Sequence, residues 1–344
     1  MRKRWLLRLR VIAAVWVMTA VCTVTAYAQG PLIPVGETVG IQIKMEGVLV
    51  AGVTEVRTAD GPVCPAGDAG IQAGDVIVAV DGRAVDSSAA LIEAVEGLSG
   101  GAARVTVRRD GKTQSVSVTP AMEENGGLRL GLWLRDGVAG IGTVTYIDPE
   151  TGAFGALGHG VNDIDTGVLV PVSDGDVCRA QIVDVKRGAA GSPGELAGSF
   201  DAGDVIGCIS RNTNCGIFGT IQGNMGALRS AIPVGAPQDV EKGPATILAC
   251  VAGRETAEYD VEISRTGMAA GGGRDMMVHV TDPALLERTG GIVQGMSGSP
   301  IIQNGKLVGA VTHVLVNDPT RGYGIFIDNM LDASKLAASS EFAA

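Results

Sequence analysis

One stretch decides the fold of this chain: Gly290-Gly291-Ile292-Val293-Gln294-Gly295-Met296-Ser297-Gly298-Ser299-Pro300. Two apolar runs follow it, residues 301–303 and residues 306–314, and Asn304-Gly305 joins them. Asn-Gly between two apolar runs is the strongest short-range signal for a β-hairpin. The glycines beside Ser297 allow backbone conformations that other residues resist. The sequence therefore predicts a serine on a tight turn that leads directly into a hairpin.

The same turn predicts a site for a developing negative charge. It can aim the amides of Gly295 and Ser297 at one point, which an oxyanion hole requires. Most Ser/Gly loops before a hairpin have no chemistry, so an ordinary loop is the alternative. Gly-x-Ser-Gly-x-Pro followed by such a strand pair resembles the nucleophile turn of chymotrypsin-like serine peptidases. Ser297 would then need partners elsewhere in the chain.

A serine nucleophile needs a base within hydrogen-bond reach, and the base needs an orienting group. The chain has three histidines. His159 lies between two glycines after an apolar run, which is typical of an exposed and sharply directed side chain. His279 lies in an alternating run on a strand face, and His313 ends the hairpin strand after the serine. We predict His159 as the base and keep His313 and His279 as alternatives.

The residues alone leave the orienting acid open. Asp163 and Asp165 follow His159 closely, although residues 162–166 are also typical of an ordinary polar turn. Asp282 follows a strand and precedes Pro283, a position that ends regular structure and fixes the side chain. A metal hydrolase that uses His159, Asp163 and Asp165 is a further hypothesis.

Composition indicates turn-rich β structure. The chain has 344 residues, enough for two ordinary domains, with 51 glycines and only 3% aromatic residues. A charged fraction of 19% and a hydrophobic fraction of 46% exclude a disordered chain. The cysteines are widely spaced without a Cys-x-x-Cys pair, which matches neither a zinc pattern nor a disulfide framework. We expect no metal and no cofactor.

The N-terminus has the pattern of an export signal. Residues 1–10 hold five basic side chains and no acid, residues 11–26 are apolar, and Ala26-Tyr27-Ala28 fits a cleavage site. An uncleaved membrane anchor is the alternative, and both place the rest of the chain outside the cytoplasm. Removing those five of the 27 basic residues leaves 37 acidic ones and a net charge of −15, which argues against nucleic acid as a partner.

The first half contains Ala69-Gly70-Ile71-Gln72-Ala73-Gly74-Asp75-Val76-Ile77, then Val80-Asp81-Gly82, and serines at 87–88 placed to cap a helix. On these residues, the stretch 38–120 resembles a PDZ domain of the kind attached to exported bacterial proteases. PDZ domains bind a peptide as an added strand at a sheet edge. The resemblance implies that the peptide is held by a carboxylate loop and by an apolar pocket beside the helix. The residues matched to these two features are Gly47, Val48, Leu49 and Val50 in the loop, and Leu91 and Val95 in the pocket. The alternative is a groove that is empty or filled by a segment of this chain.

Beyond residue 128, turns at regular intervals and almost no helical periodicity predict a β-barrel. The predicted fold is mainly β, with a small α/β PDZ domain followed by a chymotrypsin-like barrel domain. The expected organisation is a signal peptide or anchor at 1–28, the PDZ domain with a lead-in at 29–120, a linker at 121–137 and a peptidase domain at 138–344.

The second half contains four characteristic motifs: Gly155-Ala156-Leu157-Gly158-His159-Gly160, Thr281-Asp282-Pro283, the Ser297 turn, and Gly309-Ala310-Val311-Thr312-His313-Val314 with residues 316–320. With these motifs it resembles the peptidase domain of the stage IV sporulation protein B family. The order of signal, PDZ domain and peptidase domain also agrees. The resemblance implies His159 as base, Ser297 as nucleophile and Asp282 as the third catalytic residue.

The resemblance also implies a biological role. It indicates a self-cleaving serine endopeptidase, secreted from the forespore into the space between its two surrounding membranes. There it would cut a membrane-bound regulator of an intramembrane protease, which leads to sigma-factor activation. Its own N-terminal segment would be a second substrate, cut in an exposed stretch between about residues 28 and 38. The alternative function is a PDZ peptide-binding scaffold on a catalytically inert barrel.

Overall fold

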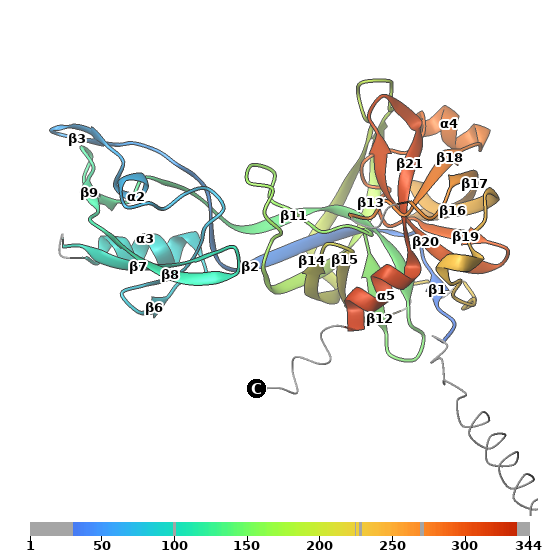
Figure 1. The fold of residues 1–344 in the computed structure, drawn as a ribbon, viewed down its shortest axis with the longest axis horizontal. Coiled ribbons are helices and arrows are strands. Elements are labelled where there is room, and N and C mark those ends of the chain that lie inside the picture. The colour runs from blue at the N-terminus through green and yellow to red at the C-terminus, as the bar shows by residue number, and fades with distance from the viewer. Residues whose placement is uncertain (1–29, 99–100, 224, 227–228, 269–271, 336–344) are drawn as a thin grey trace, which may run out of the picture. The chain divides into compact units, whose positions relative to one another are not determined.

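The computed structural model describes residues 30–98, 101–223, 225–226, 229–268 and 272–335. The predicted signal peptide or anchor at residues 1–28 lies outside these ranges. None of the helices within them has the length and apolarity that a membrane span needs. The described chain consists of a small α/β domain and two β-barrels (Figure 1).

The first barrel closes because β11 pairs with strands on both of its edges. The strand order is β11-β12-β15-β14-β13-β2, and β2 pairs again with β11. Its core holds Val39, Ile41, Phe154 and Ile209, all buried. The bounds are β2 (Thr38–Val53), β11 (Leu132–Ile147), β12 (Ala153–Ala156), β13 (Val172–Lys186), β14 (Glu195–Thr213) and β15 (Gly216–Ile221), with β1 (Ile33–Pro34) added beside β11.

The second barrel contains the predicted hairpin. Asn304 and Gly305 have φ of 51° and 73°, the paired positive values that a two-residue hairpin turn requires. The bounds are β16 (Gly243–Ala252), β17 (Glu255–Arg265), β18 (Met276–Val280), β19 (Pro300–Gln303), β20 (Lys306–Leu315) and β21 (Asp318–Phe326), with α4 (Pro283–Thr289) and η1 (Pro237–Asp239). Helix α5 (Ile327–Lys335) packs Met330 and Leu331 in a cluster with Tyr146 of the first barrel and Leu307 of the second. The two barrels therefore share a core under this helix.

The small domain has the expected capped helix. The hydroxyl of Ser87 accepts a hydrogen bond from the amide of Ala90 at 3.2 Å, and α3 (Ser88–Glu96) buries Leu91 and Val95. The remaining elements are β3 (Val56–Thr58), β4 (Gly61–Val63), α2 (Pro65–Asp68), β5 (Val76–Val80), β6 (Arg83–Ala84), β7 (Ala103–Arg109), β8 (Lys112–Val118), β9 (Ala121–Met122) and β10 (Leu128–Arg129).

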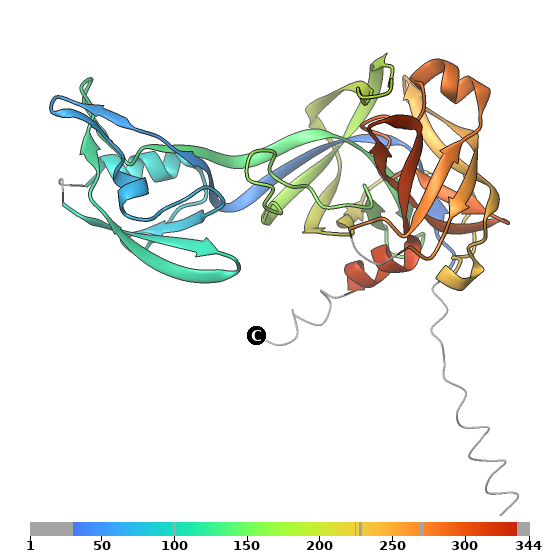
Figure 2. The same ribbon diagram turned by 45° about the horizontal axis from the view of Figure 1, so that its top comes forward.

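The predicted domain boundaries need correction, because two strands belong to both parts. Figures 1 and 2 show β2 and β11 as continuous ribbons that enter both the small domain and the first barrel. Val39 and Ile41 lie in the barrel core, whereas Val48 and Val50 lie in the core of the small domain. The apolar pattern of residues 38–53 contains no turn signal, so one strand serves both cores.

The predicted linker at 121–137 is also wrong as a linker. It contains β9, β10 and the start of β11, and Leu128 and Leu130 are buried in the core of the small domain. The small domain is thus an insertion between two strands of the first barrel. Strand β1 of the predicted lead-in pairs with β11, and residues 38–44 of the predicted PDZ domain also belong to the barrel.

Candidate active site

The serine turn is held between the two barrels by a glycine. Gly298 has φ of +99°, and its amide donates to the carbonyl of Val311 at 2.7 Å. A Cβ atom at Gly298 would lie 2.0 Å from the carbonyl oxygen of Thr143 in the first barrel. Only glycine permits this approach. The sequence thus places Ser297 directly on the interface between the barrels.

The amides of Gly295 and Ser297 make no hydrogen bond with any described residue. The carbonyls of the same two peptide units are held: that of Gln294 accepts from the amide of Leu196 at 2.9 Å, and that of Met296 accepts from the amide of Ser299 at 3.0 Å. Thr143 also holds the turn, because its hydroxyl donates to the carbonyl of Gly295 at 2.8 Å and its amide donates to the carbonyl of Ser297 at 3.2 Å. Gly295 and Ser297 line the same cavity. Two fixed peptide units with free donors are what stabilisation of an oxyanion needs.

His159 reaches the serine turn from the first barrel through an unusual backbone. Leu157 and Gly158 both have left-handed φ values, 69° and 71°, directly after β12. The Nδ1 atom of His159 donates to the carbonyl of Gly160 at 2.9 Å, which leaves Nε2 as the proton acceptor. Burial lowers the pKa of His159 below its ordinary value. At pH 7 the imidazole is therefore neutral and can accept a proton.

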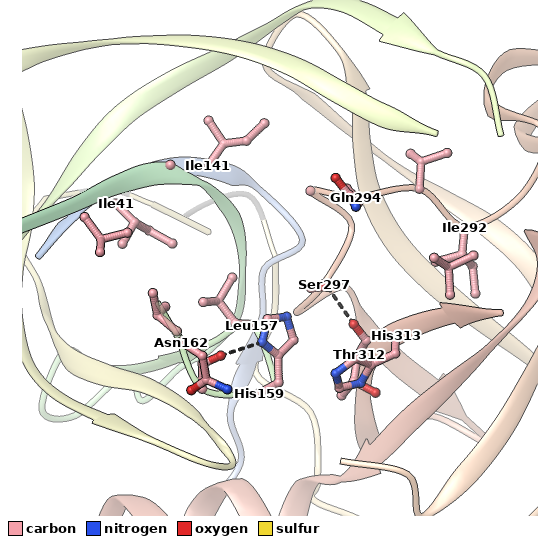
Figure 3. Close-up of a pocket in the computed structure, with 17 residues that line it drawn as sticks. Ile41, Ile141, Leu157, His159, Asn162, Ile292, Gln294, Ser297, Thr312 and His313 are labelled. Carbon is pink, nitrogen blue, oxygen red and sulfur yellow. Dashed lines mark hydrogen bonds between the residues drawn. The ribbon is translucent and has the colours of Figure 1, made fainter. Parts of the chain in front are cut away.

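The structure brings the predicted base and nucleophile to one cavity of about 430 Å³, which both barrels line (Figure 3). No hydrogen bond joins His159 and Ser297 in this arrangement. The hydroxyl of Ser297 instead donates to the carbonyl of Thr312 at 2.6 Å. Ser297 must turn away from Thr312 before it can give its proton to His159.

His313, the alternative base, lies beside His159. The two ring centroids are 5.1 Å apart and the ring planes are tilted by 39°. Burial, followed by repulsion from His159 and Arg274, lowers the pKa of His313 to about 4. The second imidazole of the site is therefore neutral at pH 7. His279, in β18, is not among the residues that line the cavity.

The three candidate acids, Asp163, Asp165 and Asp282, make their contacts elsewhere. Asp282 caps α4, accepting from the amide of Leu285 at 2.9 Å, and does not line the cavity. Asp163 is buried, accepts from the amide of Thr166 at 2.9 Å, and pairs with Nε of Arg135 at 3.1 Å. The structure therefore assigns Asp282 to helix capping, where Asp before a proline at the first helical position is favoured. The carbonyl of Gly160, rather than a carboxylate, fixes the tautomer of His159.

Substitution of Asp282 tests this assignment. Asn caps a helix about as well as Asp, so we expect Asp282→Asn to keep turnover within a few-fold of the wild type. Asp282→Ala should lose about 0.5–2 kcal/mol of stability, measured by urea unfolding. If Asp282 oriented the base during catalysis, Asn would lower kcat by about 10⁴.

The structure does not bring the residues of the metal-hydrolase hypothesis together as a set of metal ligands. Among the described residues, no three His, Cys, Asp or Glu side chains gather as a metal site would require. Asp163 and Asp165 both turn to Arg135 and not toward His159.

The predicted peptide loop of the small domain is wrong. Val48 and Leu49 lie in the middle of a sheet, paired with β5 on one side, and Leu49 and Val50 pair with β11 on the other. The side chains of Val48, Leu49 and Val50 are fully buried, and Gly47 packs against the carbonyl of Ile77. A peptide cannot add there, because β11 of the same chain already occupies the edge.

The structure contains the predicted apolar pocket beside helix α3. The side of the pocket opposite the helix is formed by other residues than the predicted loop. Leu91 and Val95 border a cavity of about 300 Å³, and residues 128–132 with Leu134 form its other side. Within that wall Gly131 has φ of +76°, and a Cβ atom there would meet the carbonyl of Thr54 at 2.3 Å. The available signal is the pattern Leu130-Gly131-Leu132, which the predicted organisation assigns to the linker at 121–137 and not to the PDZ domain.

Comparison with protein families gives two matches. The family model described as SpoIVB peptidase S55 matches residues 126–331, and the model of the PDZ domain matches residues 38–119. The first covers more than half of the chain. The predicted fold class, a PDZ domain followed by a β-barrel serine peptidase domain, is confirmed.

Several solved structures are similar to parts of the chain. The PDZ domain of an SdrC-like protein from Listeria monocytogenes shares 26% identity over 27% of this chain and 93% of its own, with a TM-score of 0.23. The Rv3671c protease from M. tuberculosis shares 16% over 57% and 74%, with a TM-score of 0.31. The HtrA-type protease AlgW, solved with a decapeptide, shares 13% over 60% and 54%, with a TM-score of 0.34. No curated protein sequence matches this chain.

Proposed function

Because the chain belongs to the family of SpoIVB peptidases S55 and is a serine endopeptidase with a PDZ domain, we propose that it is exported and acts on a regulatory protein at a membrane during sporulation. Its own N-terminal segment is the second proposed substrate. The observation that supports a peptidase most directly is the meeting of Ser297, His159 and two free amides at one cavity.

The geometry supports an acyl-transfer mechanism. The hydroxyl of Ser297 rotates from Thr312 toward His159, and Nε2 of His159 takes its proton as Oγ attacks the scissile carbonyl. The amides of Gly295 and Ser297 hold the oxyanion that forms. Protonated His159 then gives its proton to the leaving amine, and water repeats the sequence to release the acyl group.

The proposed self-cleavage is restricted by the N-terminal strand. Leu32 and Val35 are buried, and β1 pairs with β11, so most of residues 28–38 is not the exposed stretch that the sequence suggests. Among the described residues of that stretch, Gly30 and Pro31 are exposed. We place the cut before Leu32, because the chain there can enter the active-site cavity of a peptidase without breaking the pairing of β1 with β11.

The groove beside α3 is the proposed peptide site of the PDZ domain. The amides of Leu130 and Gly131 make no hydrogen bond with described residues, and they lie in the wall that faces Leu91 and Val95. Free amides next to an apolar pocket suit a peptide C-terminus, whose carboxylate and last side chain need those two features.

The test of self-cleavage is the intact mass of the full chain beside Ser297→Ala after incubation. We expect the wild type to lose an N-terminal piece and the variant to keep its full mass. Trimming of pure Ser297→Ala at the same rate would contradict self-cleavage. A chain that binds peptides but whose Ser297 does not react with a fluorophosphonate probe would support the alternative, a PDZ scaffold on an inert barrel.

A further inference from the structure

The residues that precede the oxyanion amides in the chain form an apolar part of the active-site cavity wall. Ile292 and Val293 immediately precede Gln294 and Gly295 in the chain, and both are nearly fully buried, with 2% and 1% exposure. The carbonyl of Val293 accepts from the amide of Met296 at 3.1 Å, which fixes this wall to the serine turn. Val314, half-buried in β20, completes it.

The position of the oxyanion amides decides which substrate residue this wall can contact. The residue that supplies the attacked carbonyl must place that oxygen at the amides of Gly295 and Ser297. Its own Cβ is two bonds from that carbonyl carbon, so its side chain lies against the nearest surface. The apolar lining residues nearest to Gly295 in the chain are Ile292 and Val293, and Val314 lines the same cavity.

The cavity offers no partner for a charged side chain. None of the 17 lining residues is Asp, Glu, Lys or Arg. The two histidines that line it are neutral at pH 7, because burial lowers the pKa of each. A charged side chain that enters such a site loses its water and gains no counter-charge, which is strongly unfavourable.

We propose that the peptidase selects substrates with an aliphatic residue on the acyl side of the scissile bond, and that Val314 determines this choice. The proposal rests on the peptidase function of Ser297. Ile292 and Val293 are part of the barrel core, whereas Val314 is only half-buried at the rim of that core. Val314 is therefore the position where the wall can change without loss of the fold.

A peptide library that varies only the residue before the scissile bond tests the proposal with the full chain. We expect the wild type to cleave peptides with Val, Leu or Ile at least about 100-fold faster than peptides with Lys or Asp. Val314→Asp should reverse the preference toward Lys and Arg, because a carboxylate then meets the incoming cation. Val316→Asp is the matched control, because Val316 is 50% exposed and lies outside the cavity. This variant should still prefer substrates with an aliphatic residue before the scissile bond.

Labelling of Ser297 by a fluorophosphonate probe distinguishes a failure of the peptidase function from a failure of the proposed specificity. A wild type that does not react contradicts the peptidase function itself. A wild type that reacts but cleaves charged and aliphatic peptides equally contradicts only the specificity. If Val314→Asp does not fold, Val314→Ala replaces it, and the wider cavity should then shift preference from Val toward Leu and Phe. An unchanged preference in a folded Val314→Ala would overturn the role of Val314.

Discussion

Ser297→Ala is expected to lower peptide turnover by up to ~10⁶, the usual loss when the nucleophile of a serine peptidase is removed. The variant should remain folded, because Ser297 is only half-buried and its hydroxyl makes one hydrogen bond, to the carbonyl of Thr312 at 2.6 Å. Thr312 keeps its other anchor, from its own hydroxyl to the carbonyl of Gly273 at 2.6 Å. The measurement is cleavage of an aliphatic peptide substrate, with circular dichroism to confirm the fold.

The matched control for this variant is two residues away. Ser299 is fully buried on the same turn, and its hydroxyl has no hydrogen-bond partner among the described residues. Removing an unpaired buried hydroxyl is neutral or stabilising, so Ser299→Ala should keep turnover and stability close to those of the wild type. Equal losses in both variants would show that the turn, and not the hydroxyl of Ser297, is what the reaction needs.

Local patterns predict the hairpin and the turn that presents Ser297, because both depend on residues close together in sequence, where glycine and Asn-Gly have specific backbone effects. The expectation that His159 is exposed is wrong: the ring is partly buried, and this burial lowers its pKa. That Ser297 and His159 share a cavity is a long-range result. It required a family resemblance in the sequence, and the contacts of Gly298 with Thr143 and Leu157 provide its physical basis.

Where the sequence misled, residues with two compatible roles were involved. Asp282 before a proline suits a helix cap as well as an orienting acid, and only the contact with Leu285 decides. Val48–Val50 have the composition of either an edge strand or a central strand. Pairing with β11, which lies more than 80 residues further along the chain, makes them central. Strand partners at such separation leave no signal in a local pattern.

Gly298→Ala is expected to remove activity and to destabilise the protein by about 3–5 kcal/mol, because backbone strain and overpacking both apply. The φ of +99° is unfavourable for alanine, and the added methyl group would meet the backbone of Thr143 and Leu157 at 2.0 and 2.6 Å. Neither backbone can yield easily. Leu157 precedes His159 by two residues, and Thr143 holds the carbonyls of Gly295 and Ser297. A shift of either contact moves the base or the oxyanion amides away from Ser297, and catalysis tolerates such shifts poorly.

Gly305→Ala separates crowding from the unfavourable backbone angle. Gly305 has a positive φ of 73° in the hairpin turn, but a Cβ atom there would meet nothing within 4 Å. Its alanine variant should lose only about 1 kcal/mol, the cost of a left-handed residue, and should keep full turnover and fluorophosphonate labelling. Urea unfolding and labelling of both variants give the comparison. If Gly298→Ala lost no more stability than Gly305→Ala and still labelled at the wild-type rate, the close contact between the barrels would not be what holds the nucleophile beside His159. The core that the two barrels share under α5 would then be what holds His159 and Ser297 at one cavity.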